Sequence, residues 1–183
     1  MKKRLFLAIN FPETVLNEVY TIQQELKQHN KQPGIAWVEK GNIHLTVFFI
    51  DEVSEDLVPT IIDALEKNVP KTKFSLFVRP EIGGFPNSKR PKVVFVKVND
   101  SEKLRGLVNA VEKALYSLHI PERDNLFHPH ITLAKIKDAV FFATGTAITI
   151  RNNESPVESI DLMESVLMPT GSKYLLVKKI ALT

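Results

Sequence analysis

The sequence contains no cysteine among its 183 residues. Disulfide bonds, thiolate metal sites and a cysteine nucleophile are therefore excluded. The chain also lacks a long apolar run, because no stretch approaches the roughly 18–20 residues of a membrane-spanning helix. The apolar residues 5–9 follow a basic tip, but Asn10 and Pro12 end this run short of the roughly 7–15 apolar residues of a secretory signal. We expect a cytoplasmic protein that does not associate with membranes.

Neither sign of charge dominates the chain. The 24 basic residues exceed the 21 acidic residues by a formal net charge of +3. This small excess slightly favours an anionic ligand and differs from the strongly basic surface of a dedicated duplex-binding protein. Apolar residues make up 44% and charged residues 25%, which is typical of globular proteins. We predict a single domain over residues 1–183 and expect a monomer.

Periodic apolar patterns divide the chain into strands and helices. Helices are predicted after Pro12, after Ser54 and after Ser101, with both serines as N-caps. Residues 83–91 form a predicted turn-rich loop, and residues 137–143 are ambiguous. Strands are predicted at residues 4–9, 35–38, 44–50, 74–79, 93–98, 130–135, 148–150, 160–167 and 174–182. Clustered strands interrupted by helices predict an α+β fold with mostly antiparallel sheets.

One short motif occurs twice, as His44-Leu45-Thr46-Val47 and His130-Ile131-Thr132-Leu133. The two histidines are 86 residues apart (130 − 44), close to half the chain length. This spacing suggests two similar halves that face each other across a shared site. Alternate residues of a strand point to the same side, so each histidine should project together with the threonine two positions later. Each motif therefore offers an imidazole beside a hydroxyl.

Two histidines suit the hydrolysis of a phosphodiester. The imidazole pKa is near 6.5, so one ring can accept a proton from attacking water while the other protonates the leaving oxygen. Threonine hydroxyls can donate hydrogen bonds to the phosphate oxygens. This chemistry requires neither a metal ion nor a cofactor. The competing interpretation is that each histidine is a half-buried core residue. This interpretation suits one isolated triplet better than a matched pair. A random sequence of this composition would contain roughly 0.3 His-x-Thr triplets, whereas this chain contains two.

A wider set of residues, spread over nearly the whole chain, resembles a known family. Besides the two motifs, the set comprises Arg4–Ile9, Trp37-Val38, Asn42-Ile43, Gly84-Phe85-Pro86-Asn87, Arg90-Pro91, Phe127-His128-Pro129, Leu162–Ser165 and Pro169-x-Gly171-x-x-Tyr174. In this order they are similar to the RNA 2',3'-cyclic phosphodiesterases of the two-histidine phosphoesterases, also called the LigT-like or 2'-5' RNA ligase group. The ordered set is far more specific than either motif alone.

The resemblance implies two pseudo-symmetric lobes, each an antiparallel sheet with helices packed outside, and a central cleft lined by one motif from each lobe. It implies hydrolysis of 2',3'-cyclic phosphate ends of RNA or nucleotides to 2'-phosphomonoesters, and in some members a reversible 2'-5' ligation. It also implies that His44 is the proton donor and His130 the proton acceptor. Two alternatives stay open. One is a small cyclic nucleotide or ADP-ribose cyclic phosphate as substrate, and the other is a non-catalytic RNA-binding module.

Two further residues are candidates for substrate binding, beside Thr46 and Thr132. Lys135 stands where family members commonly have arginine, and lysine keeps the charge but loses the bidentate fork. Lys135 either contacts the phosphate or is a solvated strand end. Phe85 lies in the predicted loop, where it either stacks on a base or plugs the loop onto the core.

Two other side-chain groups lie near the motifs. His128 and His130 could face the same way, but Pro129 lies between them and no further ligand clusters nearby, so a metal site is not predicted. Glu164 and Ser165 lie in an apolar predicted strand, from which they could hydrogen-bond to a motif histidine.

Overall fold

The structure is a computed structural model that describes residues 1–121, 126–137, 141–143, 149–151, 153–169 and 171–183. Its α-helices are α1 (Glu13–His29), α2 (Val58–Asn68) and α3 (Glu102–Tyr116), and its 3-10 helices are η1 (Lys40–Asn42) and η2 (Glu55–Leu57). Its strands are β1 (Lys2–Ile9), β2 (Ile35–Trp37), β3 (Leu45–Ser54), β4 (Phe74–Phe85), β5 (Val93–Val98), β6 (His130–Ile136), β7 (Glu154–Val157), β8 (Ser159–Met168) and β9 (Gly171–Ala181).

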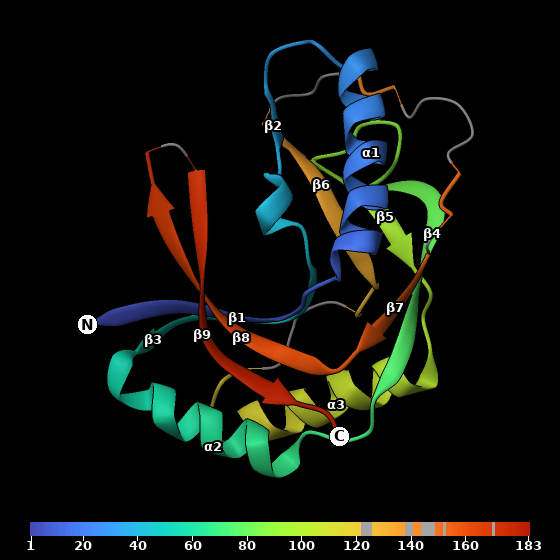
Figure 1. The fold of residues 1–183 in the computed structure, drawn as a ribbon. Helices are drawn as coiled ribbons and strands as arrows, with labels where there is room; N and C mark the ends of the chain where they lie inside the picture. Colours follow the sequence, from blue (N-terminus) through green and yellow to red (C-terminus); the bar gives the residue numbers. More distant parts are fainter. Residues whose placement is uncertain (122–125, 138–140, 144–148, 152, 170) are drawn as a thin grey trace.

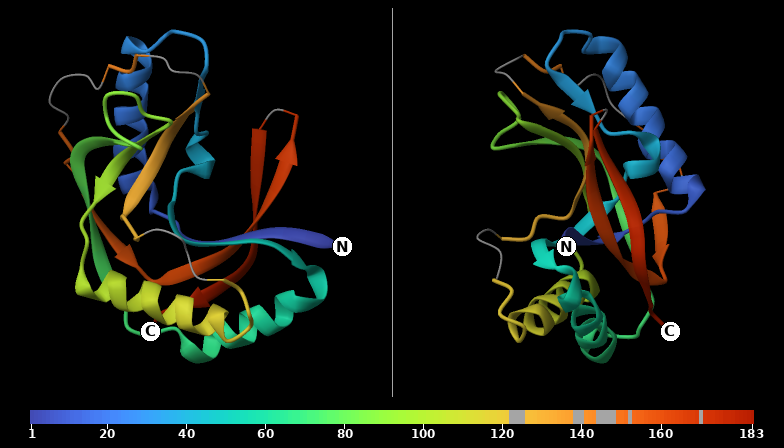
Figure 2. Two further views of the ribbon diagram at one scale, coloured as in Figure 1. Left: turned by 180° about the vertical axis from the view of Figure 1, so that it is seen from behind. Right: turned by 90° about the vertical axis from the view of Figure 1, so that its left-hand side faces the viewer.

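The strands follow one antiparallel path in the order β7-β4-β5-β6-β3-β1-β8-β9, with β2 paired to β6. The path curls into a partial barrel, and its concave arrangement is visible in Figures 1 and 2. Helices α2 and α3 lie side by side at one end, whereas α1 stands apart at the other end (Figure 1). The predicted α+β class with antiparallel strands is confirmed.

The two motif strands are neighbours in this path. β3 and β6 meet through one residue pair, Leu45 with Ile131, and each of these residues directly follows a motif histidine. Leu45 and Ile131 are both fully buried, so they anchor the junction in the core. The chain therefore brings its two motifs together at the place where the β1–β3–β8–β9 side of the sheet joins the β2–β4–β5–β6 side.

The apolar faces predicted from the sequence are the faces that pack inward. Val15, Val19, Ile22 and Leu26 of α1 are buried. In α3 the predicted N-cap is confirmed, because the Ser101 hydroxyl accepts a hydrogen bond from the Leu104 backbone N–H at 3.2 Å. The buried side chains of helices and strands form one continuous cluster. No helix among the described residues is long and apolar enough to cross a membrane.

Two sequence predictions differ from the structure, and one strand was not predicted. Ser54 ends β3 and does not cap α2, since η2 intervenes and a proline in the first turn of α2 fixes where that helix begins. The predicted loop at residues 83–91 loses its first three residues to β4, where glycines let the neighbouring strand approach closely. Strand β7 was not predicted because it contains Pro156, which is tolerated at this outer position of the sheet.

Two predicted regions fall partly outside the described residues. The ambiguous segment at 137–143 is described except for 138–140, and no helix or strand is assigned to its described part. Of the strand predicted at 148–150, residue 148 is not described, and residues 149 and 150 belong to no strand.

Candidate active site

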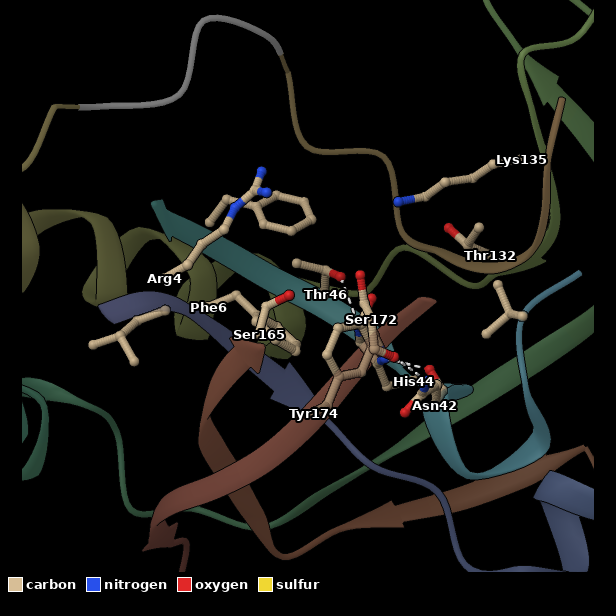
Figure 3. A pocket seen from close by; sticks show the side chains of 13 residues that line it. Arg4, Phe6, Asn42, His44, Thr46, Thr132, Lys135, Ser165, Ser172 and Tyr174 are labelled. Carbon is tan, nitrogen blue, oxygen red and sulfur yellow. Dashed lines mark hydrogen bonds between the residues drawn. The ribbon is translucent and has the colours of Figure 1, made fainter. Parts of the chain in front are cut away.

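A pocket opens where the two motif strands meet, and its lining comes from both sides of the sheet (Figure 3). β3 and the segment before it supply Asn42, His44 and Thr46, while β6 supplies Thr132 and Lys135. Strands β1, β8 and β9 supply the facing wall, which includes Arg4, Phe6, Ser165, Ser172 and Tyr174. The pocket therefore combines polar and cationic side chains from segments far apart in the chain.

His44 is held at both ring nitrogens. Its Nδ1 lies 2.7 Å from the Asn42 carbonyl oxygen, and its Nε2 lies 2.9 Å from the Thr46 hydroxyl. A carbonyl oxygen can only accept, so Nδ1 carries the hydrogen. In the neutral ring Nε2 then accepts from the Thr46 hydroxyl, and in the protonated ring it donates. The predicted projection of His44 and Thr46 to the same side is confirmed.

His130 has the same backbone hydrogen bond at Nδ1 as His44. Its Nδ1 lies 2.6 Å from the His128 carbonyl oxygen, again two residues earlier in the chain. Its ring packs against two phenylalanines, with centroids 5.1 Å from Phe85 at nearly right angles and 5.0 Å from Phe95. The same backbone anchor therefore fixes Nδ1 as the protonated nitrogen in both histidines, so Nε2 is the nitrogen that gains or loses a proton when either ring titrates.

The pKa values of both histidines are shifted in the same direction. Burial lowers the pKa of His44, and the positive charges of His130 and Lys135 lower it further against the opposing effect of the Asn42 carbonyl. Burial also lowers the pKa of His130, with a smaller contribution from His128 and an opposing one from the His128 carbonyl. Both rings therefore favour the neutral form in the absence of a ligand.

Aromatic rings enclose His44 on the side away from β6. The ring centroid of Phe6 lies 5.1 Å from that of His44, and the Tyr174 ring lies 5.4 Å away, edge-on. Burial raises the pKa of Tyr174, so its hydroxyl stays protonated at neutral pH. The Asn42 side chain donates to the Ser172 carbonyl at 2.9 Å and thereby joins the start of the first motif to the β8–β9 hairpin.

The remaining predicted site residues differ in how they lie. Thr132 and Lys135 line the pocket, and the Lys135 amine points into it (Figure 3). The described residues that line the pocket include neither His130 nor Phe85. Phe85 is half-buried, with its ring centroid 4.5 Å from that of Phe95, and it supports the His130 ring.

Several lining residues were not predicted as site residues. Arg4, Phe6 and Tyr174 belong to segments that carried the family resemblance, but the pattern within one strand does not reveal which strands become neighbours in the sheet. Glu164 lies beside Lys3, and its carboxylate accepts a hydrogen bond from the Lys3 amine at 2.8 Å. The described residues contain no group of three or more histidine, aspartate or glutamate side chains that could hold a metal ion.

Imidazole, hydroxyl and lysine side chains that lie close together can perform acid–base chemistry on an anionic ester. The family model described as LigT like Phosphoesterase matches residues 9–95. The RNA 2',3'-cyclic phosphodiesterase of Thermus thermophilus is 32% identical over 98% of this chain and 90% of its own. The protein of the same name from Aeropyrum pernix is 34% identical over 75% of this chain and 80% of its own.

Solved structures agree with this relationship. The protein TT0787 of Thermus thermophilus has a TM-score of 0.81 and 29% identity, covering 98% of this chain and 97% of its own. E. coli LigT in its apo form has a TM-score of 0.80 at 24% identity, covering 100% and 98%, and shows the shared fold. The chain belongs to the LigT-like phosphoesterase family, and it is an enzyme.

Proposed function

We propose that this enzyme hydrolyses 2',3'-cyclic phosphodiester ends of RNA to 2'-phosphomonoesters. The observation that carries this proposal is the matched anchoring of the two histidines, whose Nδ1 atoms both donate to a backbone carbonyl, so that Nε2 is the nitrogen that gains or loses a proton on each of two neighbouring strands. The names of the curated relatives support the substrate, since they are RNA 2',3'-cyclic phosphodiesterases.

In the proposed reaction His130 accepts a proton from water as the water oxygen bonds to phosphorus. His44 gives its proton to the 3'-oxygen as the bond from phosphorus to that oxygen breaks. The two imidazoles thus carry out both proton transfers, and the proposed mechanism has no step that depends on a metal ion. A 5'-hydroxyl in place of water would give the 2'-5' ligation by the same steps.

The donor must be protonated, although burial favours a neutral His44 in the free enzyme. A bound phosphodiester carries a negative charge, which raises the pKa of an imidazole beside it. Substrate binding thus favours protonation of His44, which supplies the proton for the leaving oxygen. Once His44 is protonated, its Nε2 no longer accepts from Thr46, so the threonine hydroxyl is released to donate to a phosphate oxygen. We propose that the Thr132 hydroxyl likewise donates a hydrogen bond to a phosphate oxygen. We propose that the positive charge of Lys135 attracts the negatively charged phosphate.

The test is to incubate the protein with an oligoribonucleotide that ends in a 2',3'-cyclic phosphate, in the presence of a chelator, and to identify the product. We expect a 2'-phosphate, and a fall in kcat of roughly 10²- to 10⁴-fold for both His44→Ala and His130→Ala. His29→Ala is the matched control, because His29 is exposed at the end of α1, and it should retain wild-type activity.

Three outcomes would contradict the proposal. Unimpaired turnover in either motif variant would exclude paired-histidine catalysis. Loss of wild-type activity with the chelator would exclude the metal-independent mechanism. Binding of the oligonucleotide without turnover would favour an RNA-binding module.

A further inference from the structure

Gln23 is a polar side chain on the buried face of α1. It is 1% exposed, and the same face of the helix carries the buried residues Val19, Ile22 and Leu26. Glutamine is mostly found at protein surfaces, because burying an amide without hydrogen-bond partners costs free energy. The partners of Gln23 therefore show what this position requires.

The Gln23 amide donates to two backbone carbonyls. Its Nε2 lies 2.7 Å from the Val38 oxygen and 2.9 Å from the Leu133 oxygen. Because a carbonyl oxygen can only accept, the nitrogen of the amide must face both of them. The Gln23 side-chain oxygen accepts from the Gln24 side chain at 3.3 Å. The hydrogen-bonding needs of the buried amide are thus met, and its orientation is fixed.

The two carbonyls belong to the two segments that build the active site. Leu133 is the last residue of the second motif and directly follows Thr132. Val38 lines the pocket and begins the segment that leads to His44. The Val38 N–H also donates to the Leu133 carbonyl at 2.9 Å. One side chain of α1 therefore holds the approach to the first motif against the second motif.

Residues 39–44, which end in His44, span the gap between two points of attachment to β6. One is the contact between Val38 and Leu133 that Gln23 joins, and the other is the single residue pair between β3 and β6. Both lie on the edge of β6 that faces away from β5, because β5 pairs along the opposite edge. On β6 only Thr132 separates the two points, so this span lies opposite the Thr132 position.

A compact turn carries the position of Val38 along this span to His44. In η1 the Asn42 N–H donates to the Glu39 carbonyl at 2.8 Å. The Asn42 carbonyl in turn accepts the hydrogen bond from His44 Nδ1 at 2.7 Å. If Val38 moved away from β6, the turn and its carbonyl anchor would move with it, and His44 would shift relative to Thr132.

We propose that Gln23 is a positioning residue of the active site, whose two hydrogen bonds set the distance between His44 and Thr132. The inference rests on the proposed function, in which both side chains act on one phosphate. A change in their separation therefore weakens binding of the transition state more than binding of the substrate. Gln23 is buried and is not among the described residues that line the pocket, so it acts through the backbone.

The test compares Gln23→Met with the wild-type chain on an oligoribonucleotide that ends in a 2',3'-cyclic phosphate. Methionine has a similar length to glutamine but donates no hydrogen bond. We expect kcat to fall by roughly 10- to 100-fold and KM to change by less than about threefold, since misplacement acts mainly on the transition state.

Two variants of α1 serve as matched controls. Gln28→Met makes the same exchange at an exposed position of the helix. Ile22→Val removes one buried carbon next to Gln23 and should lower the free energy of unfolding without touching the two carbonyls. Both controls should keep the wild-type kcat. A fall in kcat for Ile22→Val as large as that for Gln23→Met would assign the effect to helix packing and overturn the proposal.

Thr132→Val separates positioning from stability. If Gln23 places the Thr132 hydroxyl, the factor by which Gln23→Met lowers kcat should be at least about threefold smaller once that hydroxyl is absent. A loss of folded protein would lower activity by the same factor with either residue at position 132, and urea denaturation measures the folded fraction. Equal factors in the two backgrounds would overturn the proposal.

Failure of the inference and failure of the proposed function are distinct. If the wild type does not open the cyclic phosphate, the proposed function is overturned. If the wild type opens it and Gln23→Met keeps the wild-type kcat, only the role of Gln23 is overturned.

Gln23→Glu replaces Gln23→Met if the methionine variant does not fold. Burial favours the neutral carboxyl group, which can donate to one of the two carbonyls, so a smaller fall in kcat is expected. A wild-type kcat in Gln23→Glu would overturn the proposal. If neither variant folded, Gln23 would be needed for folding itself, and its separate role in positioning would be overturned.

Discussion

Lys135 lies on β6, but its charge acts on the histidine of the other motif. Together with burial and His130, Lys135 lowers the pKa of His44. A histidine that donates a proton must be protonated before the reaction, so its titration appears as the basic limb of the pH–rate profile. The profile of kcat/KM reports the free enzyme, in which both histidine pKa values are lowered. We therefore expect its optimum below about pH 6.5, and the limbs of kcat at higher pH because bound phosphate raises both pKa values.

Lys135→Gln tests this coupling and the assignment of roles. Removing the charge should raise the pKa of His44, so the basic limb of kcat/KM should move to higher pH while KM increases. Lys137→Gln, which removes an exposed lysine two residues along the chain, is the control and should leave the limb in place. Movement of the acidic limb would reverse the donor and acceptor roles. A profile unchanged by Lys135→Gln would contradict the electrostatic link.

At the scale of elements, the β4–β5 pair determines where His130 lies. The Phe95 ring of β5 packs over Gly83 of β4, and a Cβ added to Gly83 would meet Phe95 Cε2 at 2.3 Å. The same Phe95 ring contacts His130 at a centroid distance of 5.0 Å. A glycine in one strand thus permits the close contact that supports a proposed catalytic side chain in another.

We expect Gly83→Ala to displace Phe95, lowering the free energy of unfolding by about 1–3 kcal/mol and reducing kcat. Gly106→Ala is the opposite control. Gly106 is exposed in α3, nothing lies within 4 Å of an added Cβ, and alanine should raise the free energy of unfolding by about 0.5–1 kcal/mol without changing kcat. Urea denaturation and steady-state kinetics measure both effects. If Gly83→Ala kept the wild-type stability, the Phe95 ring would be free to move away from residue 83, and the close contact with Gly83 would not matter for the fold.

The elements that the sequence predicted well are those in which burial alone determines the pattern. The apolar stripe of α1 and the alternation around His44 and Thr46 both follow from one face packing inward. The pocket wall could not be predicted in this way, because Phe49 reaches the pocket through a bulge that depends on how β3 pairs with β1. The hydrogen bond that Lys3 donates to Glu164 could not be predicted either, since the two residues are 161 positions apart.

At the scale of the whole molecule, the two motifs come together only because both sides of the sheet join at Leu45 and Ile131. The half-chain repeat predicted this meeting, and the geometry at β3 and β6 agrees with it. The same junction holds two half-buried titratable rings, so the site should affect the stability of the entire fold. The histidines are held where burial penalises their charged forms.

The stability of the fold should therefore depend on pH through these two rings. Their pKa values in the folded state are below the value of about 6.5 in the unfolded chain. Between those values the unfolded chain binds more protons, so the free energy of unfolding is highest above about pH 6.5. It should decrease as the pH falls through 6.5 toward the folded-state pKa values. Glu81, whose pKa is lowered mainly by its hydrogen bond from Lys97, adds a separate loss only as the pH falls through about 4.5.

Replacing both rings isolates their share of this dependence. In the double variant His44→Asn with His130→Asn, the free energy of unfolding should change less between about pH 7.5 and pH 5.5 than in the wild type, because neither asparagine titrates. The double variant His29→Asn with His119→Asn removes two exposed histidines and should keep the wild-type slope. Urea denaturation at several pH values measures both. If the free energy of unfolding has the same slope against pH in the wild type and in the motif variant, burial does not penalise protonation of the two histidines. There would then be no reason to expect that bound phosphate is needed to protonate His44.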